Sequence, residues 1–332
     1  MTQDVFRSMT CATAPGGAPP KDKAMPMAVD AATATLLEQM AESGAKPLHE
    51  MTPEEARGFG VMLKQLYGPG PEVSSVENIT IPSPDGDVPA WVITPTATPR
   101  AVIVYYHGGG WVIGALDEFE TLGRQLAQRT SATVVLIDYR LAPEHRYPAA
   151  ADDAWTSLQW VAANLKNDLP LIVMGDSAGG NLSAIVAQRA RESGPAIALQ
   201  VLVYPVTDCD VDNGTYSDPE NQLLLTRDGM IWFWDHYAPD RSVRTSPDAS
   251  PARAEDLTGL PPAVVVLAEH DVLREEGEAY AQALEKAGVP VTQRRFDGQM
   301  HGFFTMPNVL PGSVKALEFV ATRIDEVLGG RA

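Results

Sequence analysis

One serine of this chain lies between glycines in a pattern that suits a nucleophile. Residues 171–181 read LIVMGDSAGGN, an apolar run followed at once by Gly175, Ser177 and Gly179. Small residues two positions before and after the serine permit the sharp strand-to-helix turn that lifts its hydroxyl clear of the backbone. A serine hydroxyl is a weak nucleophile until a base removes its proton. The pattern therefore predicts chemistry only together with a partner histidine.

A base and an acid follow Ser177 in the chain. His301 lies in the glycine-bounded stretch DGQMHG after the last expected strand, where a loop can hold an imidazole above the sheet edge. Asp271 ends the apolar run AVVVLAEHD, so it lies at the carboxyl end of a strand, as Ser177 does. We predict that His301 is the base and that Asp271 orients it. Glu269 and Asp297 are the alternative acids.

A run of three glycines could stabilise negative charge on a substrate oxygen. The segment HGGGW follows an apolar run, and glycines allow successive backbone N–H groups to point at one spot. We predict that Gly108, Gly109 and Ala178 donate the hydrogen bonds. His107 is expected to bond the backbone of this loop.

Nucleotide binding fits the same glycines poorly. Residues 175–180 match the glycine spacing of a phosphate-binding loop, but Asn181 and Leu182 stand where lysine and a hydroxyl residue are required. Residues 108–113 lack the third glycine of the dinucleotide pattern. No metal or cofactor motif is found, so we predict that none is required.

Alternating elements can bring these residues together. Apolar runs without polar alternation indicate strands of a parallel sheet that is covered on both faces; they are 101–107, 133–139, 171–176, 199–205, 263–271 and 291–296. Helical segments fit between and around them at 117–129, 149–165, 178–192, 274–287 and 314–328. Residues 76–81 and 88–93 flank a turn and predict an antiparallel hairpin. Further helices are expected at 29–43 and 52–66. The pattern is typical of a doubly wound α/β sheet.

The interval between Val206 and Pro262 is too long for an ordinary crossover. It contains a helical stretch that places Met230, Phe233, Trp234 and Tyr237 on one face. Core packing and pocket lining explain this face about equally well.

The composition of the chain argues against some classes of partner and bears on its location. The 332 residues include 43 acidic and 25 basic ones, for a formal charge of −18, which argues against nucleic acid as a partner. No apolar stretch approaches the length of a membrane helix, and the N-terminal residues do not resemble a secretory signal. The only cysteines are Cys11 and Cys209, which favours a cytoplasmic location.

Five motifs in order resemble those of the hormone-sensitive-lipase-like bacterial esterases: HGGGW, YRLAPEH, GDSAGGN, DVLREEG and DGQMHGF. The resemblance covers about residues 77–328. It implies an α/β-hydrolase fold with a mostly parallel eight-stranded sheet, and Ser177, Asp271 and His301 as catalytic triad. It also implies a core of residues 46–205 and 238–332 beneath a helical cap of residues 1–45 and 206–237. One departure is Val272, where the family commonly has proline.

The resemblance implies a carboxylesterase without cofactor that acts on a small-molecule ester. By this analogy we expect short acyl esters, roughly C2–C8, with Trp111 narrowing the acyl side. Trp111, Asp176 and Trp234 are predicted to line the substrate pocket, and Asp176 is expected to brace the serine turn. Members of the family often pair through the last strand, so a homodimer is an expectation. The alternatives are hormone binding without hydrolysis, as in plant gibberellin receptors, and amide hydrolysis.

Overall fold

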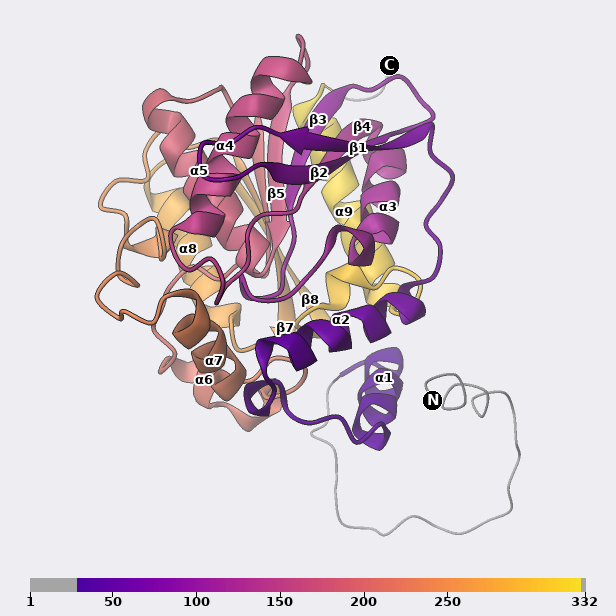
Figure 1. The fold of residues 1–332 in the computed structure, drawn as a ribbon, viewed down its shortest axis with the longest axis vertical. Coiled ribbons are helices and arrows are strands. Elements are labelled where there is room, and N and C mark those ends of the chain that lie inside the picture. The colour runs from indigo at the N-terminus through magenta and orange to yellow at the C-terminus, as the bar shows by residue number, and fades with distance from the viewer. Residues whose placement is uncertain (1–28, 330–332) are drawn as a thin grey trace.

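The computed structural model describes residues 29–329, and its centre is one eight-stranded sheet (Figure 1). The strand order is β1-β2-β4-β3-β5-β6-β7-β8. The strands are β1 (Ser75–Ile81), β2 (Val88–Thr94), β3 (Ala101–Tyr106), β4 (Ala132–Ile137), β5 (Leu171–Asp176), β6 (Leu199–Val203), β7 (Ala263–His270) and β8 (Val291–Met300). β1 and β2 form the expected antiparallel hairpin, and β3 to β8 pair in parallel.

Buried apolar runs explain why the central strands are parallel. Every residue of β3, β5 and β6 is buried, because helices cover both faces of the sheet. On one face lie α3 (Glu120–Thr130) and α9 (Pro311–Val327), and on the other α4 (Ala149–Asn164), α5 (Ala178–Ser193) and α8 (Arg274–Lys286). The predicted α/β fold with a mostly parallel sheet is confirmed.

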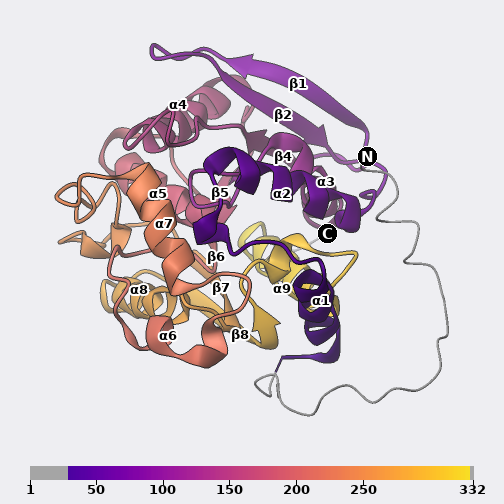
Figure 2. The same ribbon diagram turned by 60° about the horizontal axis from the view of Figure 1, so that its bottom comes forward.

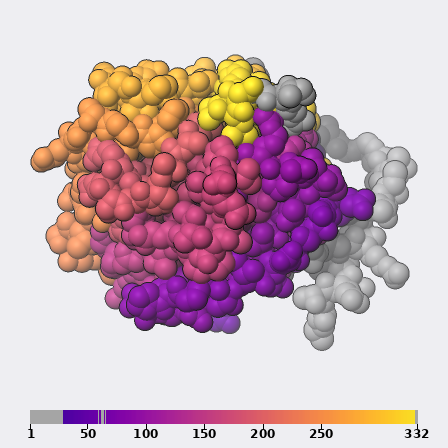
Figure 3. All heavy atoms as spheres, turned by 90° about the horizontal axis from the view of Figure 1, so that it is seen from above, coloured from indigo at the N-terminus to yellow at the C-terminus, as the bar shows by residue number. Residues whose placement is uncertain are grey.

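Four more helices lie at the end of the molecule where the parallel strands end. They are α1 (Ala31–Glu42), α2 (Pro53–Tyr67), α6 (Gly214–Ser217) and α7 (Arg227–Tyr237), and Figure 2 looks onto this end. Figure 3 shows the opposite end, where purple N-terminal segments lie beside magenta and yellow ones. The predicted cap segment 1–45 thus contributes α1, while its residues 1–28 lie outside the described residues. Within the expected core, α2 lies at this end as well.

Local sequence explains where α2 begins. Thr52 accepts a hydrogen bond from the backbone N–H of Glu55, while the Glu55 carboxylate accepts one from the backbone N–H of Thr52. Pro53 occupies the first position of the helix, where its missing N–H costs nothing. Within residues 29–329, no helix combines the length and the apolar character needed to cross a membrane.

The last strand is longer than predicted. β8 extends to Met300 instead of Phe296, because pairing with β7 resumes after a shift of register near Ala268. Gly298 lies within this irregular stretch with φ +71°, and its N–H donates to Glu269 Oε2 at 2.7 Å. As a result, the residue after Met300 leaves the sheet at the carboxyl end of a strand.

Candidate active site

Ser177 occupies a sharp turn between β5 and α5. Its backbone has φ +55° and ψ −118°, a conformation that is costly for a residue with a side chain. The turn brings the backbone of Gly179 so close to β3 that an added Cβ would overlap the carbonyl oxygen of Tyr106. An added Cβ on Gly175 would likewise overlap Gly179. The two glycines are therefore required by the turn that presents the serine hydroxyl.

The structure brings Ser177, His301 and Asp271 into one hydrogen-bonded row. His301 Nε2 lies 3.0 Å from Ser177 Oγ, and His301 Nδ1 lies 2.7 Å from Asp271 Oδ2. Asp271 is fully buried, and its Oδ1 accepts the backbone N–H of Leu273 at 2.9 Å. A carboxylate at Nδ1 holds the proton there, which leaves Nε2 free to accept the serine proton. The ring of Tyr204 packs against His301 with centroids 4.6 Å apart.

The alternative acids have other partners. Glu269 accepts the backbone N–H of Gly298 and so fixes the irregular stretch of β8. Asp297 is exposed and contacts Arg295 at 3.3 Å. Of the three acids that the sequence left open, Asp271 is the one whose carboxylate is hydrogen-bonded to the ring of His301.

The glycine loop differs from the prediction at Gly108. The N–H of Gly108 donates to Asp176 Oδ1 at 2.9 Å, so it is not free for a substrate oxygen. Gly109 and Gly110 have φ +109° and +58°, and among the described residues their N–H groups have no acceptor. A side chain at Gly110 would overlap the ring of Phe233. Gly109 and Gly110 are therefore the two glycines of the loop that can donate to a ligand.

Asp176 ties the glycine loop to the sheet. Besides Gly108, its Oδ1 accepts the hydroxyl of Tyr105 at 2.6 Å. Burial raises the pKa of Asp176 to about 6, although these hydrogen bonds and the nearby His301 act in the opposite direction. The residue was predicted to brace the serine turn; from its place directly before Ser177 it joins the turn to β3 and to the glycine loop.

His107 is buried in the same loop. Its Nδ1 lies 2.7 Å from the carbonyl oxygen of Gly108, and its ring stacks between Tyr139 and Phe119. Burial lowers the pKa of His107 to about 4, so the ring is neutral near neutral pH. The neutral ring donates from Nδ1 to the loop carbonyl, a contact within the loop backbone.

A cavity of about 150 Å³ lies over Ser177 and His301. Asp176 borders it, whereas Trp111 and Trp234 do not, contrary to the prediction. Trp111 is fully buried and stacks on Tyr237 with centroids 4.2 Å apart, and Trp234 packs against Trp111 at 4.8 Å. The two tryptophans attach α7 to the glycine loop. The residues that line the cavity from the segment after α1, from α2, and from α7 and the segment before it are Leu48, Gly60, Tyr67, Leu224, Leu225 and Phe233.

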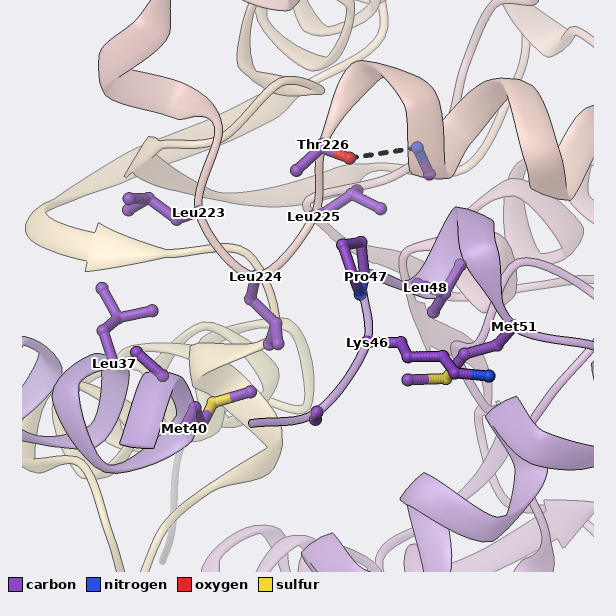
Figure 4. Close-up of a pocket in the computed structure, with 13 residues that line it drawn as sticks. Leu37, Met40, Lys46, Pro47, Leu48, Met51, Leu223, Leu224, Leu225 and Thr226 are labelled. Atoms are coloured by element: carbon purple, nitrogen blue, oxygen red, sulfur yellow. Dashed lines mark hydrogen bonds between the residues drawn. The ribbon is translucent and has the colours of Figure 1, made fainter. Parts of the chain in front are cut away.

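A second, apolar cavity of about 370 Å³ lies beside the first (Figure 4). It is enclosed by α1, the segment after α1 and residues 223–226. Leu48, Leu224 and Leu225 line both cavities, and we call these three side chains the leucine partition. The partition separates the space over Ser177 from the larger cavity.

Comparison with known proteins places this site in a family. A family model described as alpha/beta hydrolase fold matches residues 103–305, a span that contains the glycine loop, Ser177, Asp271 and His301. The chain belongs to the alpha/beta hydrolase fold family. A carboxylic ester hydrolase, LipN, of Mycobacterium tuberculosis is 42% identical over 260 residues, which cover 74% of this chain and 69% of LipN.

Other relatives are similar to this hydrolase in sequence or structure along almost the whole chain. An ethyl acetate hydrolase of Pseudomonas putida is 32% identical over 307 residues, 87% of this chain and 96% of that protein. The crystal structure of a thermostable esterase from Pseudomonas putida superposes with a TM-score of 0.84 at 36% identity, covering 91% of this chain and 98% of that one. The predicted resemblance to bacterial esterases of the α/β-hydrolase fold is confirmed.

Gly110 and Glu118 are among the site residues of this hydrolase that were not predicted from the sequence. Gly110 was passed over because a run of three glycines does not show which N–H groups are taken. Glu118 lines the cavity but carries no motif, so nothing in its sequence neighbourhood singled it out. Among the described residues, no cluster of three or more His, Cys, Asp or Glu side chains could hold a metal ion.

Proposed function

We propose that this carboxylesterase hydrolyses short- and medium-chain acyl esters through an acyl-enzyme on Ser177. The observation that carries the proposal is the hydrogen-bonded row, with 3.0 Å between His301 Nε2 and Ser177 Oγ and 2.7 Å between His301 Nδ1 and Asp271 Oδ2. These distances are within the range for a nucleophile and its general base. The ester-hydrolase names of the relatives support the reaction class.

The row supports two successive half-reactions, and each includes two proton transfers through His301. Ser177 Oγ attacks the ester carbonyl carbon while its proton moves to His301 Nε2, and the imidazolium is stabilised by Asp271. The tetrahedral intermediate then breaks the ester C–O bond, and His301 returns the proton to the departing alcohol. Water, deprotonated by His301, attacks the acyl-enzyme, and Ser177 leaves with the proton as the acid is released.

Backbone N–H groups are proposed to stabilise the intermediate. Ala178 is the first residue of α5, where helix N–H groups lack partners within the helix. Together with Gly109 and Gly110 it offers three donors near Ser177 for a developing oxyanion. Gly108 acts through its bond to Asp176, which fixes the loop instead of binding the substrate.

The size of the cavity supports short acyl chains. At about 150 Å³ it lies below the ~300–1,000 Å³ that is usual for pockets holding drug-sized ligands. The leucine partition closes the side that faces the second cavity. An acyl chain that extends from the first cavity toward the second must therefore displace Leu48, Leu224 or Leu225.

The chain-length dependence of kcat/KM tests this proposal. With p-nitrophenyl esters from C2 to C16, we expect the best substrate between C2 and C8 and a decline beyond it. Leu224→Ala joins the two cavities, so the optimum should move to longer chains. Leu223→Ala is the control, since Leu223 lines the second cavity but not the first. A wild-type optimum at C14 or longer would overturn the proposal.

Location and assembly remain predictions. The low number of cysteines favours the cytoplasm, and β8 forms an edge of the sheet at which two copies could pair. Amide hydrolysis uses the same groups, and matched ester and amide substrates would distinguish the two activities. Binding without hydrolysis is disfavoured because the chain retains His301.

A further inference from the structure

One wall of the Ser177 cavity carries a carboxyl group that ester hydrolysis does not need. Glu118 ends the short helix η2 (Leu116–Glu118) and lines this cavity. A Cβ added to Gly60 would lie 2.5 Å from Glu118 Oε2, so the backbone of α2 lies close against the carboxyl group. Glu118 is half-buried. Its backbone N–H donates to the carbonyl oxygen of Ala115, but within residues 29–329 its carboxyl group has no hydrogen bond or ion pair.

The acidic neighbours of Glu118 are already neutralised. Asp117 Oδ2 pairs with Lys64 at 2.6 Å, and Glu120 Oε1 pairs with Arg124 at 2.7 Å. These cations are therefore engaged by other carboxylates. Glu118 differs from these neighbours because it lines the substrate cavity and forms no ion pair with any cation of the described residues.

Glu118 lies at a boundary between two spaces. A larger cavity of about 760 Å³ is open to solvent and is lined by both ion pairs. Glu118 and Tyr67 line this cavity and also the one over Ser177. A substrate with its carbonyl at Ser177 can therefore direct a charged end past Tyr67 toward solvent.

Aromatic rings complete the surroundings of Glu118. Tyr67, Phe119 and Phe233 line the cavity over Ser177. The faces of aromatic rings attract cations, and a half-buried carboxylate without a partner is stabilised by one. The formal charge of −18 also raises the local concentration of cationic molecules. The carboxylate, the aromatic rings and the negative field of the whole protein all favour a cationic ligand.

We propose that Glu118 is a specificity residue that favours esters bearing an ammonium group. The inference rests on the proposed ester hydrolysis and adds a substrate class to it. The ester carbonyl binds at Ser177, and the cation lies between the Glu118 carboxylate and the ring of Tyr67. Neutral short esters are hydrolysed by the same machinery but lack this contact.

The preference depends on the protonation of Glu118. Burial, and next the charge of Asp117, raise the pKa of Glu118 to about 7, while Lys64 acts to lower it. Below this value the carboxyl group is neutral, and above it the group attracts a cation. The preference should therefore increase between pH 6 and 8. The other titratable side chains around this cavity are Tyr67, whose pKa is raised to about 12, Asp176 and His301.

Two esters of matched shape test the proposal. Acetylcholine carries a quaternary ammonium group, and 3,3-dimethylbutyl acetate is its neutral analogue; acid release is followed in a pH-stat. Because both esters use Ser177 and His301, the ratio of their kcat/KM values cancels the titration of the shared groups. In wild type we expect this ratio to exceed one at pH 8 and to fall toward pH 6. Glu118→Gln should lower the ratio at pH 8 about fivefold to tenfold and make it nearly independent of pH.

Glu120→Gln is the matched control, because its carboxylate is paired with Arg124 outside the Ser177 cavity. It should change the ratio less than twofold. If Glu118→Gln leaves the ratio within twofold of wild type while the neutral ester is still hydrolysed, the proposed role of Glu118 is overturned. The proposed ester hydrolysis then still stands. Failure of wild type to hydrolyse the neutral ester and p-nitrophenyl acetate would instead overturn the proposed function, and this inference with it.

Discussion

Ser177→Ala is expected to lower kcat for a short acyl ester about 10⁴- to 10⁶-fold. Without Oγ no acyl-enzyme forms, and the remaining donors can only assist slow attack by water. The side chain is small and buried, and within residues 29–329 its one hydrogen bond is to His301, so the fold should be retained. Steady-state kinetics with p-nitrophenyl butyrate measure the loss, and thermal unfolding checks the fold.

Ser183→Ala provides the matched control for this prediction. Ser183 lies on the same helix, α5, and donates a hydrogen bond to the carbonyl oxygen of Gly179. The change removes a buried serine hydroxyl close to the site but no reacting atom, so kcat should fall less than about tenfold. Activity in Ser177→Ala within about tenfold of wild type would contradict the mechanism.

Asp271→Asn should lower kcat about 10⁴-fold, because it moves the proton of His301 from Nδ1 to Nε2. The backbone N–H of Leu273 donates to Oδ1, so an asparagine would keep its oxygen there and turn its NH₂ group toward Nδ1. Nδ1 must then accept a hydrogen bond, and the proton moves to Nε2. A protonated Nε2 cannot take the proton of Ser177. The pH-rate profile of kcat and the thermal unfolding midpoint would both be measured.

Glu269→Gln tests which of the two acids at the end of β7, Glu269 or Asp271, orients His301. Glu269 accepts the N–H of Gly298, and the oxygen of a glutamine can accept the same bond. We therefore expect a loss in kcat below about tenfold. If Glu269→Gln abolished activity and Asp271→Asn did not, the acid of the triad would have been assigned to the wrong residue.

The elements that present the triad were predictable because their signals are local. Continuous apolar runs mark buried parallel strands, and β5 and β7 end where Ser177 and Asp271 were expected. The turn at Ser177 requires small residues on both sides, and the sequence shows them directly. Since the carboxyl ends of parallel strands meet at one edge, strand order was sufficient to bring distant side chains together.

The donors of the glycine loop could not be assigned in the same way. Which N–H groups remain free depends on Asp176, whose carboxylate turns back to bind Gly108. This contact joins two segments that are distant in sequence and has no periodicity. The position of the glycine loop was therefore predictable. That the N–H of Gly108 is taken while that of Gly110 is free was not.

The residues that line the cavity could not be predicted from the sequence either. The helical spacing in α7 placed Phe233 and Trp234 on one face and left core packing and pocket lining open; both side chains are buried, but they have different surroundings. Phe233 faces the cavity, whereas Trp234 packs against Trp111. Glu118 lines the cavity because η2 places it against Gly60 of α2, a tertiary contact without a sequence signal.

Covalent labelling tests most directly whether His301 activates Ser177. Intact protein would be treated with a fluorophosphonate probe, and the labelled peptide identified by mass spectrometry. We predict one adduct per chain, carried by Ser177 and lost in both Ser177→Ala and His301→Ala. A folded wild-type protein that remains unlabelled at Ser177, or that reacts equally well without His301, would contradict the account.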